Sequence, residues 1–322
     1  MVKFIHAADV HLGIMVAGVG KSQKEIAREL KKAAFDAFER VIDTAIEEEV
    51  DALVLAGDLL DSSRTFVKEK CFLQSQLNRL APFGIPVVVA LGNHDAGSAY
   101  VSGKHIYTFG SAVETIEVET RNGERVAFSG FSYEVPVVAT RKVQEYPVKS
   151  ANFDIHIGVL HGELTTSQGR YAPFSIPELR EKGYDYWALG HIHTCQEVSS
   201  QPCAWYSGTT QGANRKESGS KGALLVEITP GNTPVVHLIE TNTMEWMDVE
   251  LALSDTARLE TLPYLIVEAL PNPSKRSLVT LHLQTQESIY SREDLKQLTQ
   301  VVNGLLEEKR SLVTVMSIRE QV

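Results

Sequence analysis

The sequence predicts an α/β protein in which two β-sheets pack as a sandwich flanked by helices, followed by a small mixed α/β domain at the C-terminal end. Short β-rich runs alternate with helical patterns through the first half of the chain, which is typical of this class. Five of these apolar runs end in polar side chains that can bind metal. Near Met244 such residues stop and a new series of elements begins.

The composition is that of a globular protein. The chain has 322 residues, of which 43% are hydrophobic and 22% charged, so disordered and collagen-like classes are excluded. It lacks a secretion signal and an apolar run long enough for a membrane span, so we expect a cytoplasmic protein, with nucleoid association as one location. The net charge of −10 excludes coating of DNA through overall basicity, and three cysteines fit neither a disulfide framework nor a structural zinc site.

The five apolar runs are expected to be strands. They span residues 4–8, 52–56, 87–91, 155–160 and 186–189. The polar residues that follow them are Asp9 and His11, Asp58, Asn93 and His94, His161, and His191 and His193. In open α/β sheets, ligand sites lie beyond the carboxyl ends of the strands, which is where all of these side chains fall.

Two further elements belong to the scaffold. Residues 22–25 have the S-x-x-E form of a capping box and open a stretch with apolar residues at helical spacing up to Ile42. Asn122-Gly123 predicts a turn between the alternating runs 116–118 and 126–128, which together form a β-hairpin.

A first domain is predicted over residues 1–244 and a second over residues 245–322. In the second, the pattern predicts strands at 247–251, 278–283 and 312–318 and a helix at 292–306. This segment has more acidic than basic residues, so it is not a basic DNA-binding module.

The polar side chains at the strand ends predict a site for two metal ions. Residues two apart in an extended backbone project from the same side, as in Asp9 and His11 and again in His191 and His193. Carboxylate, imidazole and amide ligands without thiolate suit manganese, iron or zinc. Seven ligands exceed the needs of one ion, and Asp58 is the natural bridge between two. The predicted ligands are Asp9, His11, Asp58, Asn93, His161, His191 and His193.

Two metal ions in such a site clamp the attacking and leaving oxygens of an in-line phosphoryl displacement, with a hydroxide held between them as the nucleophile. Histidines outside the motifs are interpreted as ordinary core or surface residues. These are His6, His105, His156, His237 and His282.

The motifs together resemble the calcineurin-like metallophosphoesterases in order and spacing. They are Asp9-Val10-His11, Gly57-Asp58-Leu59-Leu60-Asp61, Gly92-Asn93-His94-Asp95, His161-Gly162-Glu163 and Gly190-His191-Ile192-His193. The opening FIHAADVHLG and the GDLLD and GNHD forms are most similar to the DNA-repair exonuclease branch, the SbcD-type nucleases and their shorter YhaO-like relatives. The stretch from Tyr206-Ser207-Gly208-Thr209 through Glu217, together with Lys221-Gly222, adds a weaker match. The resemblance covers residues 1–240 and implies a metallophosphoesterase fold, with a capping domain that helps to orient DNA in the remainder.

The resemblance also implies individual roles. It places Asp9, His11, Asp58 and His193 on one metal, and Asp58, Asn93, His161 and His191 on the other. His94 is then not a ligand: it would stabilise the transition state and protonate the leaving oxygen, and Asp61 would orient it. Eukaryotic and archaeal relatives have a histidine at the Asp61 position, so the chain agrees with the bacterial subgroup. Asp95 is expected to brace its loop.

Candidates for contact with DNA are less specific. Basic residues expected in loops after the motif segments are Arg64, Lys68, Arg215 and Lys216. Aromatic residues that could stack on bases are Phe66, Tyr133, Tyr171 and Trp205. Ordinary solvated surface for the first group and core packing for the second are the alternatives.

Two functions remain open at this point. The branch implies a DNA phosphodiesterase with two Mn²⁺ ions, a 3′-to-5′ exonuclease with some single-strand endonuclease activity in DNA repair. The alternative is a phosphatase or cyclic-nucleotide phosphodiesterase with a small substrate, because the metal site is shared across these reactions. The acidic charge favours the second, and the motif variants and appended domain favour the first. The branch also implies self-association and an SMC-like ATPase partner, although no terminal helix pair for docking such an ATPase is recognised.

Overall fold

The computed structural model describes residues 1–13, 24–61, 67–97, 101–253, 260–285 and 290–321. The chain divides into two compact units. The first comprises Met1–Met15, Lys31–Gln211 and Lys221–Asn242, and the second comprises Val16–Leu30, Gly212–Ser220 and Thr243–Val322. The second unit therefore includes short segments from earlier in the chain. The role of residues 245–322 as a capping domain stays a prediction.

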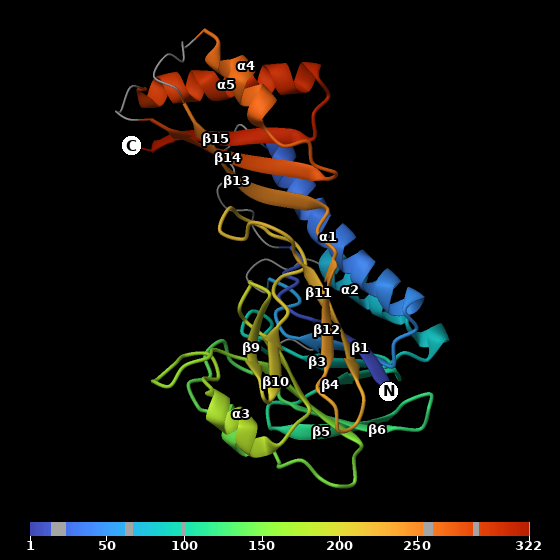
Figure 1. The fold of residues 1–322 in the computed structure, drawn as a ribbon. Coiled ribbons are helices and arrows are strands. Elements are labelled where there is room, and N and C mark those ends of the chain that lie inside the picture. Colours follow the sequence, from blue (N-terminus) through green and yellow to red (C-terminus); the bar gives the residue numbers. More distant parts are fainter. Residues whose placement is uncertain (14–23, 62–66, 98–100, 254–259, 286–289, 322) are drawn as a thin grey trace. The chain divides into compact units, whose positions relative to one another are not determined.

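The first sheet of the first unit has the strand order β12-β11-β1-β2-β3-β4 (Figure 1). Its strands are β1 (Val2–Ala7), β2 (Ala52–Ala56), β3 (Val87–Ala90), β4 (Ile106–Thr108), β11 (Gly222–Ile228) and β12 (Val235–Glu240). The four strands from β1 to β4 run parallel, whereas β11 and β12 are antiparallel to their neighbours. The carboxyl ends of β1, β2 and β3 consequently meet at one edge of the sheet.

The second sheet has the strand order β5-β6-β7-β8-β10-β9. Its strands are β5 (Glu114–Glu119), β6 (Arg125–Gly130), β7 (Ile155–His161), β8 (Tyr186–Gly190), β9 (Gln196–Ser200) and β10 (Cys203–Tyr206). The predicted hairpin is confirmed, because β5 pairs with β6 in antiparallel register with Ile116 opposite Phe128. The neighbouring strands β6, β7, β8 and β10, in the interior of the sheet, run parallel to one another.

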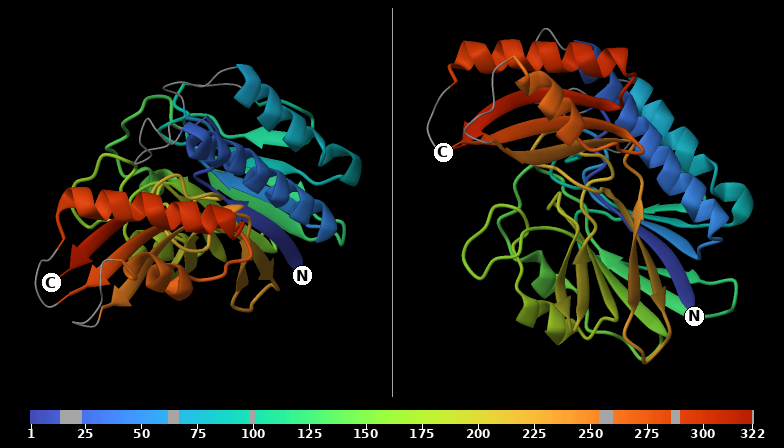
Figure 2. Two further views of the ribbon diagram at one scale, coloured as in Figure 1. Left: turned by 90° about the horizontal axis from the view of Figure 1, so that it is seen from above. Right: turned by 45° about the horizontal axis from the view of Figure 1, so that its top comes forward.

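The two sheets pack on each other through side chains that alternate along their strands. One apolar cluster between them joins Phe4 and Val54 of the first sheet to Ile157 and Tyr186 of the second. A second cluster packs the outer face of the first sheet against α1 (Lys24–Glu47) and α2 (Val67–Asn78), which lie side by side in Figure 2. Strands such as β2 are buried along their whole length, which explains the continuous apolar runs in the sequence.

The predicted helix after the first strand is α1, which begins at Lys24. The capping residues Ser22 and Gln23 lie outside the described residues. Between β7 and β8 of the second sheet, α3 (Ile176–Lys182) begins with a capping box formed by Ser175 and Glu178. None of the described helices is long and apolar enough to span a membrane.

The second unit has a parallel sheet of β13 (Met244–Ala252), β14 (Arg276–Gln284) and β15 (Val313–Gln321). One face of this sheet packs on α4 (Leu262–Ala269) and α5 (Arg292–Glu308) through a separate apolar cluster. The three strands and α5 agree with the sequence prediction, whereas α4 was not predicted. Its eight residues, LPYLIVEA, are almost uniformly apolar, so they carry no helical periodicity.

His6 joins the two sheets across the sandwich. The imidazole is fully buried, with Nε2 3.2 Å from the carbonyl oxygen of Leu189 and Nδ1 3.1 Å from the hydroxyl of Tyr186. A carbonyl only accepts, so Nε2 donates to Leu189 and Nδ1 accepts from Tyr186, which requires a neutral ring. Burial lowers the pKa of His6 from 6.5 to about 3, and the bond to Leu189 offsets only part of that effect.

Acidification should therefore destabilise the fold through His6. Below about pH 6.5 the unfolded chain binds a proton there, whereas the folded chain does so only near pH 3. The free energy of unfolding should fall as the pH drops through this window, with His6 contributing ~2 kcal/mol between pH 7 and 4.5. Urea unfolding at both pH values checks this result. His6→Gln should reduce the pH dependence, whereas His237→Gln, at an exposed position on β12, should not. An unchanged dependence in His6→Gln would contradict the assignment.

Candidate metal centre

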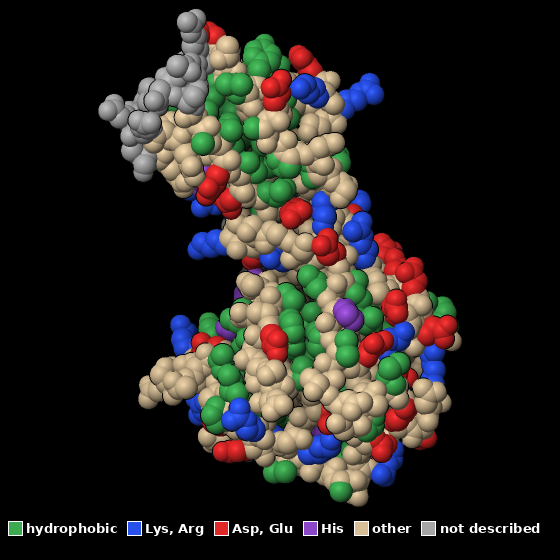
Figure 3. Space-filling model, in the orientation of Figure 1, with side chains coloured by type: hydrophobic (Ala, Val, Ile, Leu, Met, Phe, Trp, Pro, Cys, Tyr) green, Lys and Arg blue, Asp and Glu red, His purple; other side chains and the backbone are tan. Residues whose placement is uncertain are grey.

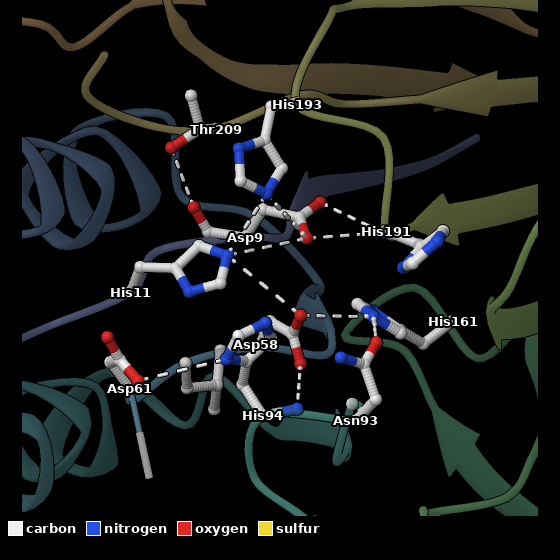
Figure 4. Close-up of polar contacts among 12 residues, drawn as sticks. Asp9, His11, Asp58, Asp61, Asn93, His94, His161, His191, His193 and Thr209 are labelled. Carbon is white, nitrogen blue, oxygen red and sulfur yellow. Dashed lines mark hydrogen bonds and ion pairs between the residues drawn. The ribbon is translucent and has the colours of Figure 1, made fainter. Parts of the chain in front are cut away.

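The predicted site residues gather at the carboxyl ends of strands from both sheets (Figure 4). Asp9 and His11 follow β1, Asp58 follows β2, Asn93 and His94 follow β3, His161 ends β7, and His191 and His193 follow β8. The two carboxylates and His161 are buried. His94, in contrast, is exposed to solvent.

The backbone at these strand ends turns sharply. The φ angles of Asp9, His11 and Asp58 are 50°, 48° and 53°, in the left-handed region that few residues other than glycine adopt. The φ of His191 is also positive, at 101°. The prediction that an extended backbone brings Asp9 and His11 to the same side is wrong, because β1 ends at Ala7. The turns instead aim both side chains at one point, a use of backbone strain that is common at functional sites.

Two glycines permit the close approach of the strand ends. A Cβ atom on Gly57 would lie 2.4 Å from Nδ1 of His161, and one on Gly92 would lie 2.2 Å from Oδ1 of Asp58. Both distances are far shorter than van der Waals contact, so a larger residue would displace the neighbouring site residue.

The first group of ligand atoms consists of Asp9, His11 and His193. The Nε2 atoms of the two histidines are 3.1 Å apart, and they lie 4.0 Å and 3.8 Å from Oδ1 of Asp9. Two ring nitrogens at this distance repel each other unless a proton or a cation lies between their lone pairs. All three residues offer ligand atoms within 4.8 Å of one another, a spacing that suits one metal ion.

The second group consists of Asp9, Asp58 and His161. Nδ1 of His161 donates to the carbonyl oxygen of Ala56 at 2.9 Å, so Nε2 points toward the site. This Nε2 lies 3.2 Å from Oδ2 of Asp58 and 3.0 Å from Oδ1 of Asn93. A hydrogen bond of this kind, from the ring nitrogen that faces away from the site to a backbone carbonyl, is typical of metal-binding histidines.

Two carboxylates connect these groups. Asp9 belongs to both groups, whereas only Asp58 was predicted to be shared. Oδ2 of Asp58 also reaches in both directions, because it lies 3.9 Å from Nε2 of His11 as well as close to His161. Both carboxylates are therefore placed to bridge two metal ions. The assignment of Asp58 as the bridging ligand stays a prediction.

His191 is placed differently from the other predicted ligands. Its backbone N–H donates to the Asp9 carboxylate, at 3.2 Å and 3.0 Å from the two oxygens. Its ring packs against His161 and Tyr171, with centroid distances of 5.3 Å and 4.8 Å. It is in neither three-residue group, so its role as a ligand stays a prediction.

His94 lies beside the ligand groups without joining them. Its Nδ1 is 3.8 Å from Oδ1 of Asp61, which is an ion-pair distance and too long for a hydrogen bond. Its ring meets His11 edge-on at a centroid distance of 5.0 Å, and its backbone N–H donates to Asp58. The imidazole is thus held next to the centre with access to solvent. Its role in protonation stays a prediction.

Asp95 braces two of the loops, as expected. Its carboxylate accepts hydrogen bonds from the backbone N–H groups of Leu59 and Leu60, at 3.1 Å and 2.9 Å, and from that of Gly92 at 3.0 Å. These bonds tie the loop that carries Asp58 to the loop that carries Asn93.

The electrostatics of the centre favour a divalent cation. Burial raises the pKa of Asp9 to about 6. Burial also opposes ionisation of Asp58, but the attraction of His161 holds the Asp58 pKa below its usual range. The reciprocal attraction overcomes burial at His161 and raises its pKa to about 9. Among the described residues, the ion-pair partners of both carboxylates are histidines. The oxygen and nitrogen donors fit divalent metal ions, which would balance the carboxylates in place of the His161 proton.

The candidates for DNA contact do not gather in the same way. Arg64 lies outside the described residues. Lys68 lies on α2 rather than in a loop, with Nζ 5.4 Å from the centroid of the Phe35 ring. Arg215 and Lys216 belong to the second unit. On the described part of the face shown in Figure 3, basic side chains are interspersed with acidic ones.

The aromatic residues predicted to stack on DNA bases differ in how far they are buried. Phe66 lies outside the described residues, and Trp205 is partly exposed on β10. Tyr133 is buried, and its hydroxyl donates to the carbonyl oxygen of His161 at 3.1 Å, so base stacking by Tyr133 is excluded by its packing. Tyr171 is half-buried against His191.

This fold and this centre define a metal-dependent phosphoester hydrolase of the two-sheet α/β type. A sequence profile of the calcineurin-like phosphoesterases matches residues 2–195, and the chain belongs to that family. It is 38% identical over 237 residues to the uncharacterized metallophosphoesterase YhaO of Bacillus subtilis, a match that covers 71% of this chain and 58% of YhaO. It is 29% identical over 269 residues to the DNA double-strand break repair protein Mre11 of Haloferax volcanii, covering 78% of this chain and 55% of that protein.

The chain spans less than two thirds of the length of these curated relatives. Among solved structures, a dimetal phosphatase from Danio rerio matches 74% of this chain and 98% of its own, with 12% identity and a TM-score of 0.43.

Proposed function

We propose that the chain is a dinuclear metal-dependent DNA phosphodiesterase, a 3′-to-5′ exonuclease with some single-strand endonuclease activity, acting in DNA repair. The observation that carries the proposal is the pair of ligand groups that share Asp9, with Asp58 reaching both. A double cation site of this kind suits the in-line displacement at a phosphoester. DNA as the substrate is supported by the motif variants of the chain and by its similarity to a DNA double-strand break repair protein.

The site residues would have two roles, metal binding and proton transfer. The ligands would be Asp9, His11, Asp58, Asn93, His161, His191 and His193. Bound divalent cations would activate water and neutralise the phosphate charge. His94 is accessible and outside the ligand groups, so it can donate a proton to the leaving oxygen, and Asp61, with Oδ1 3.8 Å from Nδ1, is placed to orient its ring. We propose Mn²⁺ for both positions, with iron and zinc as the alternatives that the same donors accept.

A phosphatase or cyclic-nucleotide phosphodiesterase is the second candidate. The net charge of −10 favours it, because an acidic protein repels a polyanion at long range. Divalent cations would make the local field positive, so the charge of the whole chain does not decide the question. A second copy of the chain and an SMC-like ATPase remain proposed partners on the resemblance alone.

DNA cleavage in Mn²⁺ is the expected result that separates these functions. Purified protein should degrade end-labelled single- and double-stranded DNA on a gel, and the rate should fall steeply with salt because binding releases counterions from the phosphates. Small reporter phosphodiesters should be cleaved slowly, since they lack contacts remote from the scissile bond. Efficient hydrolysis of a cyclic nucleotide or phosphomonoester, with no DNA cleavage at low salt, would favour the second candidate.

A further inference from the structure

Thr209 connects two of the loops that carry ligand residues (Figure 4). It lies after β10 and is 3% exposed. Its hydroxyl donates to the carbonyl oxygen of Asp9 at 2.7 Å, and its backbone N–H donates to the carbonyl oxygen of His193 at 3.2 Å. One residue thus bonds to the main chain of two members of the first ligand group.

The bond to Asp9 satisfies a carbonyl that the fold leaves without a strand partner. Asp9 lies beyond the end of β1, where its positive φ turns the backbone out of the sheet. The residue is fully buried, so water cannot replace the donor, and an unpaired buried carbonyl is costly. The Thr209 hydroxyl is also 3.1 Å from the carbonyl oxygen of Gln211, but its single proton favours the shorter contact to Asp9.

Gly208 allows this approach. Its φ is 75°, and a Cβ atom there would lie 2.6 Å from the backbone nitrogen of Cys195 and 3.0 Å from the carbonyl oxygen of His193. The segment that carries Thr209 therefore packs directly on the loop that carries His193, with no room for a side chain between them.

We propose that Thr209 is a positioning residue that sets the separation of Asp9 and His193 in the metal centre. Oδ1 of Asp9 and Nε2 of His193 are 3.8 Å apart, and Thr209 holds the backbone at both ends of this pair. The inference rests on the proposed metal centre, though not on DNA as its substrate. Without the hydroxyl, the Asp9 backbone can relax from its left-handed conformation and move the carboxylate away from the imidazole.

Adjacent threonines supply a matched test. Thr209→Val removes the hydroxyl and keeps the shape of the side chain, whereas Thr209→Ser keeps the donor. Thr210 is the control: it is fully buried, and its Oγ1 has no hydrogen-bond partner among the described residues. Mn²⁺ affinity is measured for each variant by competition with a chelating dye, together with thermal unfolding of the metal-free protein. We expect Thr209→Val to bind Mn²⁺ ~10–100-fold more weakly, as is typical when a residue that supports a ligand is lost.

Thr209→Ser should restore the affinity to within about threefold of the wild type, because a hydroxyl replaces a hydroxyl. Thr210→Val should leave it unchanged. A reporter phosphodiester adds a kinetic test, in which saturating Mn²⁺ should restore the kcat of Thr209→Val.

Three results would overturn the proposal: wild-type Mn²⁺ affinity in Thr209→Val, a loss in Thr209→Ser as large as in Thr209→Val, or an equal loss in Thr210→Val. A lower melting temperature of metal-free Thr209→Val with unchanged affinity would assign Thr209 a role in folding alone and would also overturn it. Because affinity is measured without DNA, failure to cleave DNA would contradict the proposed nuclease function and leave this test intact.

Discussion

Asp58→Asn is expected to abolish binding of both metal ions and, with it, phosphodiester hydrolysis. One oxygen of Asp58 lies 3.2 Å from Nε2 of His161 and 3.9 Å from Nε2 of His11, so the carboxylate faces both ligand groups. An amide has the same shape, but it lacks the negative charge and presents one oxygen instead of two. The loss of metal affinity should exceed the ~10–100-fold typical of residues that only support a ligand.

The measurement is metal content after reconstitution with Mn²⁺, followed by a melting curve with and without metal. Wild-type protein should melt at a higher temperature with metal, because ions that bind only the folded chain stabilise it. Asp58→Asn should show little of this increase. Asp154→Asn, at an exposed carboxylate that accepts from the backbone N–H of Arg125, is the control and should behave as wild type. Two tightly bound ions in Asp58→Asn would show that Asp9 alone can bridge the groups.

His94→Ala is expected to lose turnover while retaining both metal ions. The side chain is exposed and belongs to neither ligand group, so its removal leaves the donors in place. General acid catalysis contributes typically ~10²–10⁴-fold, and kcat should fall by that order. His161→Ala is the contrasting variant, because its buried imidazole faces Asp58 and Asn93 and should be needed for metal binding. Equal loss of metal in the two variants would show that the proposed role of His94 is wrong.

The strands that lead to the metal centre could be predicted because their burial is reflected directly in the sequence. A strand buried on both faces, such as β2, must be apolar throughout, and the first polar residue after it then marks the strand end. Such a marker gives the position of Asp58, but it does not give the φ of 53° that aims the carboxylate. That angle depends on contacts with a distant segment, the backbone bond from His11 to Asp58 among them.

Other features left no local signal. The stretch Gly212–Ser220 joins the second unit through tertiary packing, which an element pattern read in chain order cannot reveal. Lys68 illustrates the problem with surface charges: its long side chain lies over Phe35, and nothing in its sequence context distinguishes this packing from contact with a ligand. Thr209 follows a glycine in a weakly matching motif, so only its bond to Asp9 shows its importance.

The positive φ angles of Asp9, His11 and Asp58 orient the side chains of the centre, but they lower the thermal stability of the protein. Each residue is held in a conformation that glycine or asparagine adopts at lower cost, and such strain is worth on the order of 1–3 kcal/mol per residue. A directed-evolution screen that selects only for heat resistance of the metal-free protein would favour replacement at these three positions and would discard the predicted metal ligands. Any effort to make a thermostable form of this enzyme therefore has to exclude these positions from the library and seek its gains in the scaffold.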